Sequence, residues 1–313
     1  MILVTGGMGF IGLHTAHHLA RCGEQVLVTR YRRSRTPEFL ERYLASGQVR
    51  VAVVDVADPF SVLEAMATHR VTSVLHLAVP ALGAEPVGRE IEVNVGGLRN
   101  VLEGARALGL ERVTMASSVA VYAGSGDGPW EEAQPLPLAS PSATSAFKKA
   151  EEVLALHYAD RTGMDVCCVR IGVVYGPLYH SLSNLPSRLV HSAVRPEVAL
   201  PDRPSVPGAR LDLSDLVYAE DCAAGLTLVH LAAARRRVYN LGGGRAVADR
   251  EVAAAVVAAV PGWGPPPAGD DPGASAATRY MSLGAIGELG YQPGYSLEEG
   301  IVDYVEWIRR HEL

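Results

Sequence analysis

The glycine-rich string VTGGMGFIG, at positions 4–12, limits the possible folds of this chain more than any other segment. It follows a short β-branched run and precedes a stretch with helical periodicity, so it predicts a strand, a tight turn and a helix in that order. The first glycine allows the bend, the second lets the backbone approach a pyrophosphate, and the third allows close helix–strand packing. Free N–H groups at the helix start favour phosphate. We predict a dinucleotide site formed by Gly6, Gly9, Phe10, Ile11 and Gly12.

Short apolar runs and longer helix-like stretches alternate through the first 175 residues. The expected strands are 2–5, 25–29, 49–54, 73–77, 112–116 and 165–170, and the expected helices are 11–22, 59–68, 90–108 and 145–161. Strands that are apolar throughout are typical of a parallel sheet buried on both faces. We therefore expect an α/β fold with a doubly wound parallel sheet, the Rossmann arrangement.

The sequence changes in character after residue 177. Residues 178–216 are rich in Pro, Ser and Arg with weak periodicity, and 261–277 has the composition of a loop. A strand at 237–240 and helices near 249–259 and 297–311 are expected among them. We expect a cofactor domain of residues 1–175 and 217–244, and a smaller C-terminal substrate-binding part of residues 176–216 and 245–313.

Composition and charge exclude several classes of function. The 28 Lys and Arg against 34 Asp and Glu give a net charge of −6, unlike the basic domain of a nucleic-acid binder. Four cysteines without a CxxC pair predict neither a disulfide framework nor a zinc site, and His14, His17 and His18 lack the glutamate of HExxH, so we expect exposed helix histidines and no metal. No apolar run approaches the ~18 residues of a membrane span, and no signal peptide precedes the glycine string. We expect a cytoplasmic protein without nucleic-acid or membrane partners.

The end of the second expected strand bears on the choice between NAD and NADP. An acidic residue there would bind the adenosine ribose 2′-OH of NAD, but the chain reads VTRYRR at 28–33. An arginine at this place can hold a 2′-phosphate through a charge-assisted hydrogen bond. We predict NADP (NADPH) held by Arg30 and Arg32, with a solvated basic loop as the alternative, and Asp55 capping the adenine pocket.

Several motifs follow in order along the chain: HLA at 76–78, Asn94 with GGLRN at 96–100, SSVAVY at 117–122, RIGVVYGP at 170–177, YNLG at 239–242 and GELGYQP at 287–293. Together with the glycine string they resemble the extended short-chain dehydrogenase/reductase family, the NAD(P)-dependent epimerase/dehydratase group. The resemblance spans the chain and implies a nicotinamide beside residues 175–177. It also implies cofactor contacts from Val56, Leu77, Ala78, Lys148 and Val173.

The chemistry of this family rests on a Ser or Thr, a Tyr and a Lys, the last two spaced Tyr-x-x-x-Lys. Ser118 matches the residue that polarises the substrate carbonyl. In the family pattern an acidic residue follows the lysine by four positions and an arginine by about twenty-two; Lys148 meets both, with Glu152 and Arg170 (170 − 148 = 22). The position of the tyrosine is then taken by Thr144, and the catalytic phenol is absent.

The loss of the phenol bears on the mechanism. A phenol with a reference pKa of ~10 can be tuned by a neighbouring lysine, whereas a threonine hydroxyl cannot serve as such an acid. Lys148 and Ser118 can still bind the nicotinamide ribose and a carbonyl oxygen. The proton must then come from water, from Tyr122 or from the substrate itself, for example from a phenol beside its ketone.

The substrate-binding motifs also depart from the family pattern. Nucleotide-sugar members carry an arginine before a stretch that reads DLVYAED here, at 215–221, and Ser214 stands in its place. The later Arg-Pro-Gly is matched at best by Asp271-Pro272-Gly273, although Arg210 or Arg279 offers a replacement cation. Loss of both cations disfavours a diphosphate.

Three functions remain open. The first is an NADPH-dependent ketoreductase acting on a polycyclic aromatic polyketide ketone, since family members without the tyrosine include antibiotic-pathway reductases. The second is a nucleotide-sugar epimerase, dehydratase or reductase, and the third is a non-catalytic NADP-sensing protein. Many relatives pair through the helices that correspond to 90–108 and 145–161, so a homodimer is also expected.

Overall fold

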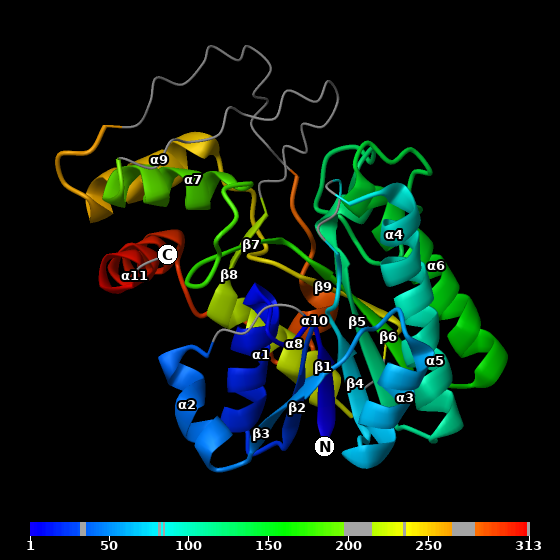
Figure 1. Ribbon diagram of the computed structural model, residues 1–313. Helices are drawn as coiled ribbons and strands as arrows, with labels where there is room; N and C mark the ends of the chain where they lie inside the picture. Colours follow the sequence, from blue (N-terminus) through cyan, green and yellow to red (C-terminus); the bar gives the residue numbers. More distant parts are fainter. Residues whose placement is uncertain are drawn as a thin grey trace.

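A seven-stranded parallel sheet forms the centre of the computed structural model, which describes residues 1–31, 36–80, 83, 85–196, 215–233, 236–264 and 279–311 (Figure 1). The strands stand in the order β3-β2-β1-β4-β5-β6-β9. They are β1 (Ile2–Thr5), β2 (Val26–Arg30), β3 (Val49–Val53), β4 (Ser73–His76), β5 (Arg112–Ser118), β6 (Val166–Ile171) and β9 (Val238–Leu241). The strand order reverses between β1 and β4, where ligands bind in doubly wound sheets. The predicted fold class is confirmed.

Helices cover both faces of this sheet, so β1, β4 and β6 are buried along their whole length, whereas the edge strand β3 is largely exposed. One face carries α1 (Phe10–Arg21), α2 (Glu38–Ala45) and α8 (Ala219–Leu231), and the other carries α3 (Pro59–Thr68), α5 (Gly97–Ala107) and α6 (Ala143–Thr162) (Figure 1). Each layer buries its own apolar cluster against the sheet. The register places Thr5 beside His76 and Ser118 beside Ile171 at the carboxyl edge of the sheet.

The expected helix at 90–108 is made of three joined segments. They are α4 (Val87–Ile91), a π-helical turn η1 (Glu92–Gly96) and α5. Asn94 lies in the π turn, fully buried, and its amide donates to the Glu90 carbonyl at 2.8 Å while its Oδ1 has no hydrogen-bond partner. π turns occur often at functional sites. At the end of β5 a short 3₁₀ turn, η2 (Val119–Tyr122), continues the chain.

A smaller group of elements packs around an apolar cluster of its own, which includes Val190, Val256 and Tyr304. It consists of α7 (Leu185–Val194), α9 (Asp249–Ala259) and α11 (Leu297–Arg310), beside a two-stranded parallel sheet of β7 (Val173–Tyr175) and β8 (Leu216–Tyr218) (Figure 1). A last short helix is α10 (Gly284–Gly287). α7 lies in a stretch where the sequence shows only weak helical periodicity. Its start is stabilised by Asn184, whose side chain caps the helix by accepting a hydrogen bond from the Ser187 N–H at 2.8 Å. In the described part of the chain, no helix is long and apolar enough to span a bilayer.

Candidate active site

The glycine turn between β1 and α1 has no room for side chains. Gly6 adopts a φ of +64°, and a Cβ there would lie 2.9 Å from the backbone of Ala78. A Cβ on Gly12 would lie 2.4 Å from the Gly6 carbonyl oxygen. α1 begins after Gly9 with no side-chain cap, so its first N–H groups are available to an anion. This cradle fits the pyrophosphate of a dinucleotide.

A cavity of about 530 Å³ lies beside the cradle at the carboxyl ends of the strands. Four of the residues predicted to bind the cofactor line it: Gly6, Asp55, Val56 and Ala78. Leu77 and Ala78 are held at the edge of β4, where both backbone N–H groups donate to Thr5 Oγ1 at 3.2 and 3.3 Å. The cavity thus lies at the reversal of strand order between β1 and β4, and its size and lining suit an adenosine half.

The other predicted cofactor residues are spread more widely. Arg30 ends β2 and is partly exposed, while Arg32 lies outside the described residues. Val173 lies on β7 and packs against the apolar cluster that contains Tyr122 and Trp130. The position of Arg30 at the strand end is the one expected for contact with the adenosine ribose.

Arg89, on α4, is a site residue that sequence reasoning missed. It lines the cavity, and its Nη2 lies 3.3 Å from Asp55 Oδ2 while its Nη1 donates to Glu92 at 2.7 Å. Hydrogen bonds to Glu92 and Asp55 raise the pKa of the guanidinium. The other Asp55 oxygen accepts from the Ala57 N–H at 3.0 Å. The carboxylate expected to cap the adenine is therefore held from both sides, in a way that no motif signals.

Ser118 stands at the carboxyl end of β5, partly exposed. Its Oγ accepts a hydrogen bond from the Ala120 N–H at 3.2 Å, which caps η2. The backbone contact uses a lone pair, so the hydroxyl proton remains able to donate to a ligand oxygen. This geometry suits the polarisation of a carbonyl.

Thr144 and Lys148 lie one turn apart at the start of α6, where Ser142 caps the helix. Lys148 is buried, and its Nζ donates to Glu151 at 2.7 Å. The neighbouring Lys149 has a different task, because its Nζ donates to the carbonyls of Ala123, Pro137 and Ala139. Of the two lysines, one thus belongs to the candidate site and the other ties down the segment that precedes α6.

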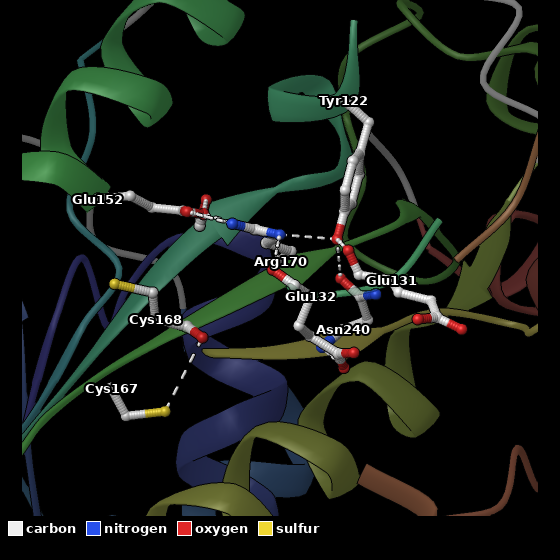
Figure 2. Close-up of polar contacts among 9 residues, drawn as sticks. Tyr122, Glu131, Glu132, Glu152, Cys167, Cys168, Arg170 and Asn240 are labelled. Atoms are coloured by element: carbon white, nitrogen blue, oxygen red, sulfur yellow. Dashed lines mark hydrogen bonds and ion pairs between the residues drawn. The ribbon is translucent and has the colours of Figure 1, made fainter. Parts of the chain in front are cut away.

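Glu152 and Arg170, which set the register of Lys148, form a buried ion pair between α6 and β6 (Figure 2). Arg170 Nε and Nη2 donate to the two Glu152 oxygens at 3.0 and 2.8 Å. Ser117 donates to the same carboxylate. The pair joins the middle of α6 to β6.

Tyr122, one of the sources considered for the proton, is enclosed in the core (Figure 2). Its hydroxyl accepts from Arg170 Nη1 at 2.7 Å and lies 2.8 Å from Asn240 Oδ1 and 3.1 Å from the Glu131 carbonyl. Burial raises the pKa of Tyr122, and the ring stacks on Trp130 at 5.2 Å. We therefore discard Tyr122 as a proton donor, because its only hydrogen is already shared with protein acceptors.

Two histidines near the site have hydrogen-bond partners within the protein. Burial and then the Lys148 charge lower the pKa of His76 to about 3, so this ring is neutral, and its Nδ1 lies 2.7 Å from Thr5 Oγ1. His14, expected to be exposed, is buried instead, because α1 packs against α8 and brings it to Glu220 and the Pro177 carbonyl, each at 3.0 Å. Within the described ranges no three His, Cys, Asp or Glu side chains gather as a metal site.

The region expected to contact a diphosphate is only partly described. Arg210, Ser214 and residues 271–273 lie outside the described residues, while the guanidinium of Arg279 lies 3.8 Å from Asp127. The glycine cradle and the cavity, with Ser118 at the end of β5 and Lys148 on α6, together indicate a dinucleotide-binding enzyme of the doubly wound α/β class.

The sequence model of the NAD dependent epimerase/dehydratase family matches residues 2–242, so the chain belongs to that family. A dTDP-glucose 4,6-dehydratase of Streptomyces antibioticus is 29% identical over 326 residues, covering 98% of this chain and 92% of that protein. A UDP-glucuronate 4-epimerase of Thermodesulfobacterium geofontis is 26% identical over 258 residues, covering 78% of this chain and 75% of that protein.

Solved structures give the same result. The UDP-glucose 4-epimerase of Thermus thermophilus in complex with NAD matches with a TM-score of 0.78 at 27% identity, covering 98% of each chain. The UDP-glucose 4-epimerase of Thermotoga maritima, solved with UDP-glucose, matches the fold with a TM-score of 0.81 at 23% identity, covering 99% of this chain and 98% of that one. The protein is therefore an enzyme of the extended short-chain dehydrogenase/reductase fold with a cofactor of the NAD(P) class.

Proposed function

We propose that this protein is an NADPH-dependent ketoreductase that reduces a carbonyl of a polycyclic aromatic polyketide, as an angucyclinone ketoreductase of antibiotic biosynthesis does. One observation carries the proposal. The site keeps Ser118 and a buried Lys148, but Thr144 occupies the position of the family's phenol, and the nearby Tyr122 and His76 cannot donate a proton. Such a site suits a substrate that carries an acidic group, such as a phenol, beside the ketone to be reduced.

The side chains divide the work of a reduction as follows. The nicotinamide cofactor supplies a hydride when bound. Ser118 donates its hydroxyl hydrogen to the ketone oxygen, and Lys148 binds the cofactor ribose from the wall of the site. The developing alkoxide takes its proton from water or from a phenol beside the ketone, because Thr144 has no acidic hydrogen at neutral pH.

Elimination of water from a sugar needs more from the protein. A base must remove a carbon-bound proton and an acid must protonate the leaving hydroxyl. The segment that follows Ser118 is Val119, Ala120 and Val121, all buried and apolar, and supplies neither group. This supports reduction over dehydration.

NADP as the specific cofactor is part of the proposal, supported by Arg30 at the end of β2 and by the absence of a carboxylate on that strand. Pairing through α5 and α6 is likewise a prediction. The outer surface of α6 carries Val153 and Leu154, which are 68% and 45% exposed and suit a homodimer contact.

Nucleotide-sugar conversion is the second candidate, and the relatives favour it. The relatives and solved structures named above include a dTDP-glucose 4,6-dehydratase and epimerases of UDP-sugars. An epimerase passes a hydride out and back, and its acid–base group must serve both directions, a task for which Thr144 is unsuited.

Deuterium transfer separates the candidates. NADPH deuterated at C4 is incubated with the protein and with aryl and quinoid ketones, and in parallel dTDP- and UDP-hexoses are supplied with NAD⁺. Deuterium in an alcohol product supports the ketoreductase, and a keto-sugar or an epimer supports the second candidate. If NADPH binds and neither reaction occurs, the NADP-sensing function is favoured and the ketoreductase is rejected.

A further inference from the structure

The ion pair of Lys148 and Glu151 differs from the other pairs with the same spacing. The two side chains are 9% and 2% exposed, and Nζ lies 2.7 Å from Oε2. The pairs Arg89–Glu92 and Arg106–Glu103 also span three residues, but each has at least one side chain about half exposed. An exposed pair contributes little, whereas two buried charges depend on each other because either one alone would be uncompensated.

The other titratable groups around Lys148 are either neutral or already bound to another residue. On α6, the carboxylate of Glu152 is occupied by Arg170 and Ser117. The His76 ring on β4 is neutral, and the Tyr122 hydroxyl on η2 bonds Arg170.

The remaining titratable groups nearby do not offer a second anion. Burial raises the pKa of the Cys168 thiol on β6, which stays protonated. Glu90, on α4, accepts from the Gly83 N–H. Within the described part of the chain, the anion that contacts the Lys148 ammonium is therefore Glu151.

The place of Thr144 explains why such a partner is needed. Helical side chains lean towards the N-terminus, so Lys148 reaches towards Thr144 one turn earlier, and Glu151 reaches back towards Lys148. A phenol at position 144 would give the ammonium a polar neighbour that can carry negative charge, and threonine cannot.

We propose that Glu151 is a positioning residue of this site: its carboxylate replaces the missing phenol as the partner that holds the Lys148 ammonium charged and in place for the cofactor ribose. This proposal rests on the cofactor site of the proposed function and not on reduction of a ketone. It can therefore be tested without a substrate.

The lysine content of the chain makes the test direct. Lys148 and Lys149 are its only lysines, so the full-length protein labelled with ¹³C-lysine gives two Cε signals, and Lys149→Arg assigns them. In Glu151→Gln the Lys148 signal is expected to titrate at least about one pH unit lower than in the wild type, because a buried ammonium without its counter-ion loses its proton more easily. The Lys149 signal, which reports on backbone carbonyl contacts, is expected to stay unchanged.

Cofactor affinity gives a second readout. The NADPH dissociation constant, measured by fluorescence titration, should begin to rise with pH at least about one pH unit earlier in Glu151→Gln than in the wild type, because the contact with the cofactor ribose is lost as the Lys148 ammonium loses its proton. Glu103→Gln is the matched control, because it removes a carboxylate from an exposed pair of the same spacing. It should match the wild type in both measurements.

A double variant separates positioning from packing. Thr144→Tyr combined with Glu151→Gln restores a partner to the ammonium, so the Lys148 titration and the NADPH affinity at pH ~9 should return towards wild-type values. If the Lys148 signal of Glu151→Gln is unmoved, or the double variant shows no recovery, the proposal is wrong. Should Glu151→Gln fail to fold, Glu151→Asp decides: a smaller shift in the same direction supports the proposal, and an unmoved signal contradicts it.

Discussion

The hydroxyl of Tyr122 lies 2.7 Å from Nη1 of Arg170, inside the core. The same guanidinium is bound to both oxygens of Glu152. The tyrosine closest in sequence to the site thus belongs to the network that joins β6 to α6 (Figure 2). Its role in this structure is to support the sheet, which leaves proton delivery to another group.

Replacing Tyr122 by phenylalanine should therefore affect stability more than turnover. The variant removes the hydrogen bonds to Arg170 and Asn240 and is expected to lower the free energy of unfolding by about 1–3 kcal/mol. Hydride transfer at saturating ketone should stay within a few fold of the wild type. A loss of about 100-fold or more in kcat, with the fold intact by circular dichroism, would instead identify Tyr122 as the acid.

Arg30→Asp should reverse the preference for NADPH over NADH. The variant removes the expected contact with the 2′-phosphate and places a carboxylate where it can accept from a ribose hydroxyl. NADPH affinity should fall about 10–100-fold, the range of one or two charge-assisted hydrogen bonds, while NADH affinity rises. Arg250→Asp, on the exposed side of α9, is the control for charge alone. An unchanged ratio of the two dissociation constants in Arg30→Asp would refute the assignment.

Ser118→Ala should lower kcat by about 10–1000-fold and leave the NADPH dissociation constant nearly unchanged. The reason is that a donor to the carbonyl oxygen acts on the transition state more than on cofactor binding. Steady-state kinetics and cofactor titration on the same preparation check this. Equal losses in both would place Ser118 in cofactor binding instead.

Thr144→Ala should retain appreciable turnover with the same ketone. The threonine hydroxyl is not acidic enough to donate a proton at neutral pH. Replacement of its side chain by the methyl group of alanine therefore removes only packing contacts and a weak hydrogen bond. The measurement is kcat over pH 6–9. A complete loss of turnover in a folded variant would show that the Thr144 hydroxyl is required.

The fold should lose stability as the pH falls from 7 to 5, partly because of His230. Burial, and then the charge of Arg112, lower the pKa of this histidine to about 3, and its ring nitrogens lie 2.9 Å from the hydroxyls of Ser73 and Thr114. Below about pH 6.5 this histidine binds a proton in the unfolded state but not in the folded state. The free energy of unfolding therefore falls by about 2 kcal/mol between pH 7 and pH 5.

The measurement is urea unfolding at pH 7 and pH 5 for the wild type and for His230→Gln, which keeps one donor and one acceptor. The wild type should lose about 2 kcal/mol more than the variant between the two pH values. Equal losses would mean that His230 is protonated in the folded protein.

The cofactor half was largely predictable from the sequence, because each element there carries a local signal. β1 and α3 begin and end where their patterns predict. The glycine turn is recognisable in the sequence because its positions leave no room for a Cβ and so require glycine. The second half was less predictable. α7 is hidden in a Pro- and Ser-rich stretch, and α8 is buried over most of its length and so lacks a polar face to mark its periodicity.

The site was predictable only where a motif fixes the residue. Ser118 and Lys148 follow from the resemblance, but Arg89 meets Asp55 across 34 positions, a contact that depends on how α4 docks. Glu151 has a visible signal, its spacing from Lys148, yet the same spacing occurs in solvated pairs such as Arg106–Glu103. Burial separates the two cases, and burial is a property of the folded chain.

The π turn at Glu92–Gly96 makes the length of this helical stretch as important as its composition. A π turn takes up one more residue than an α turn, so deletion of a single residue within it would leave a regular α-helix with Arg89 still beside Asp55. A second deletion has no such extra residue to remove, and it would rotate everything on the N-terminal side by about 100°, which carries Arg89 away from Asp55 while α5 keeps its place on the sheet. The adenine end of the cavity therefore tolerates the loss of one residue in this stretch but not of two, even where every lining side chain is unaltered.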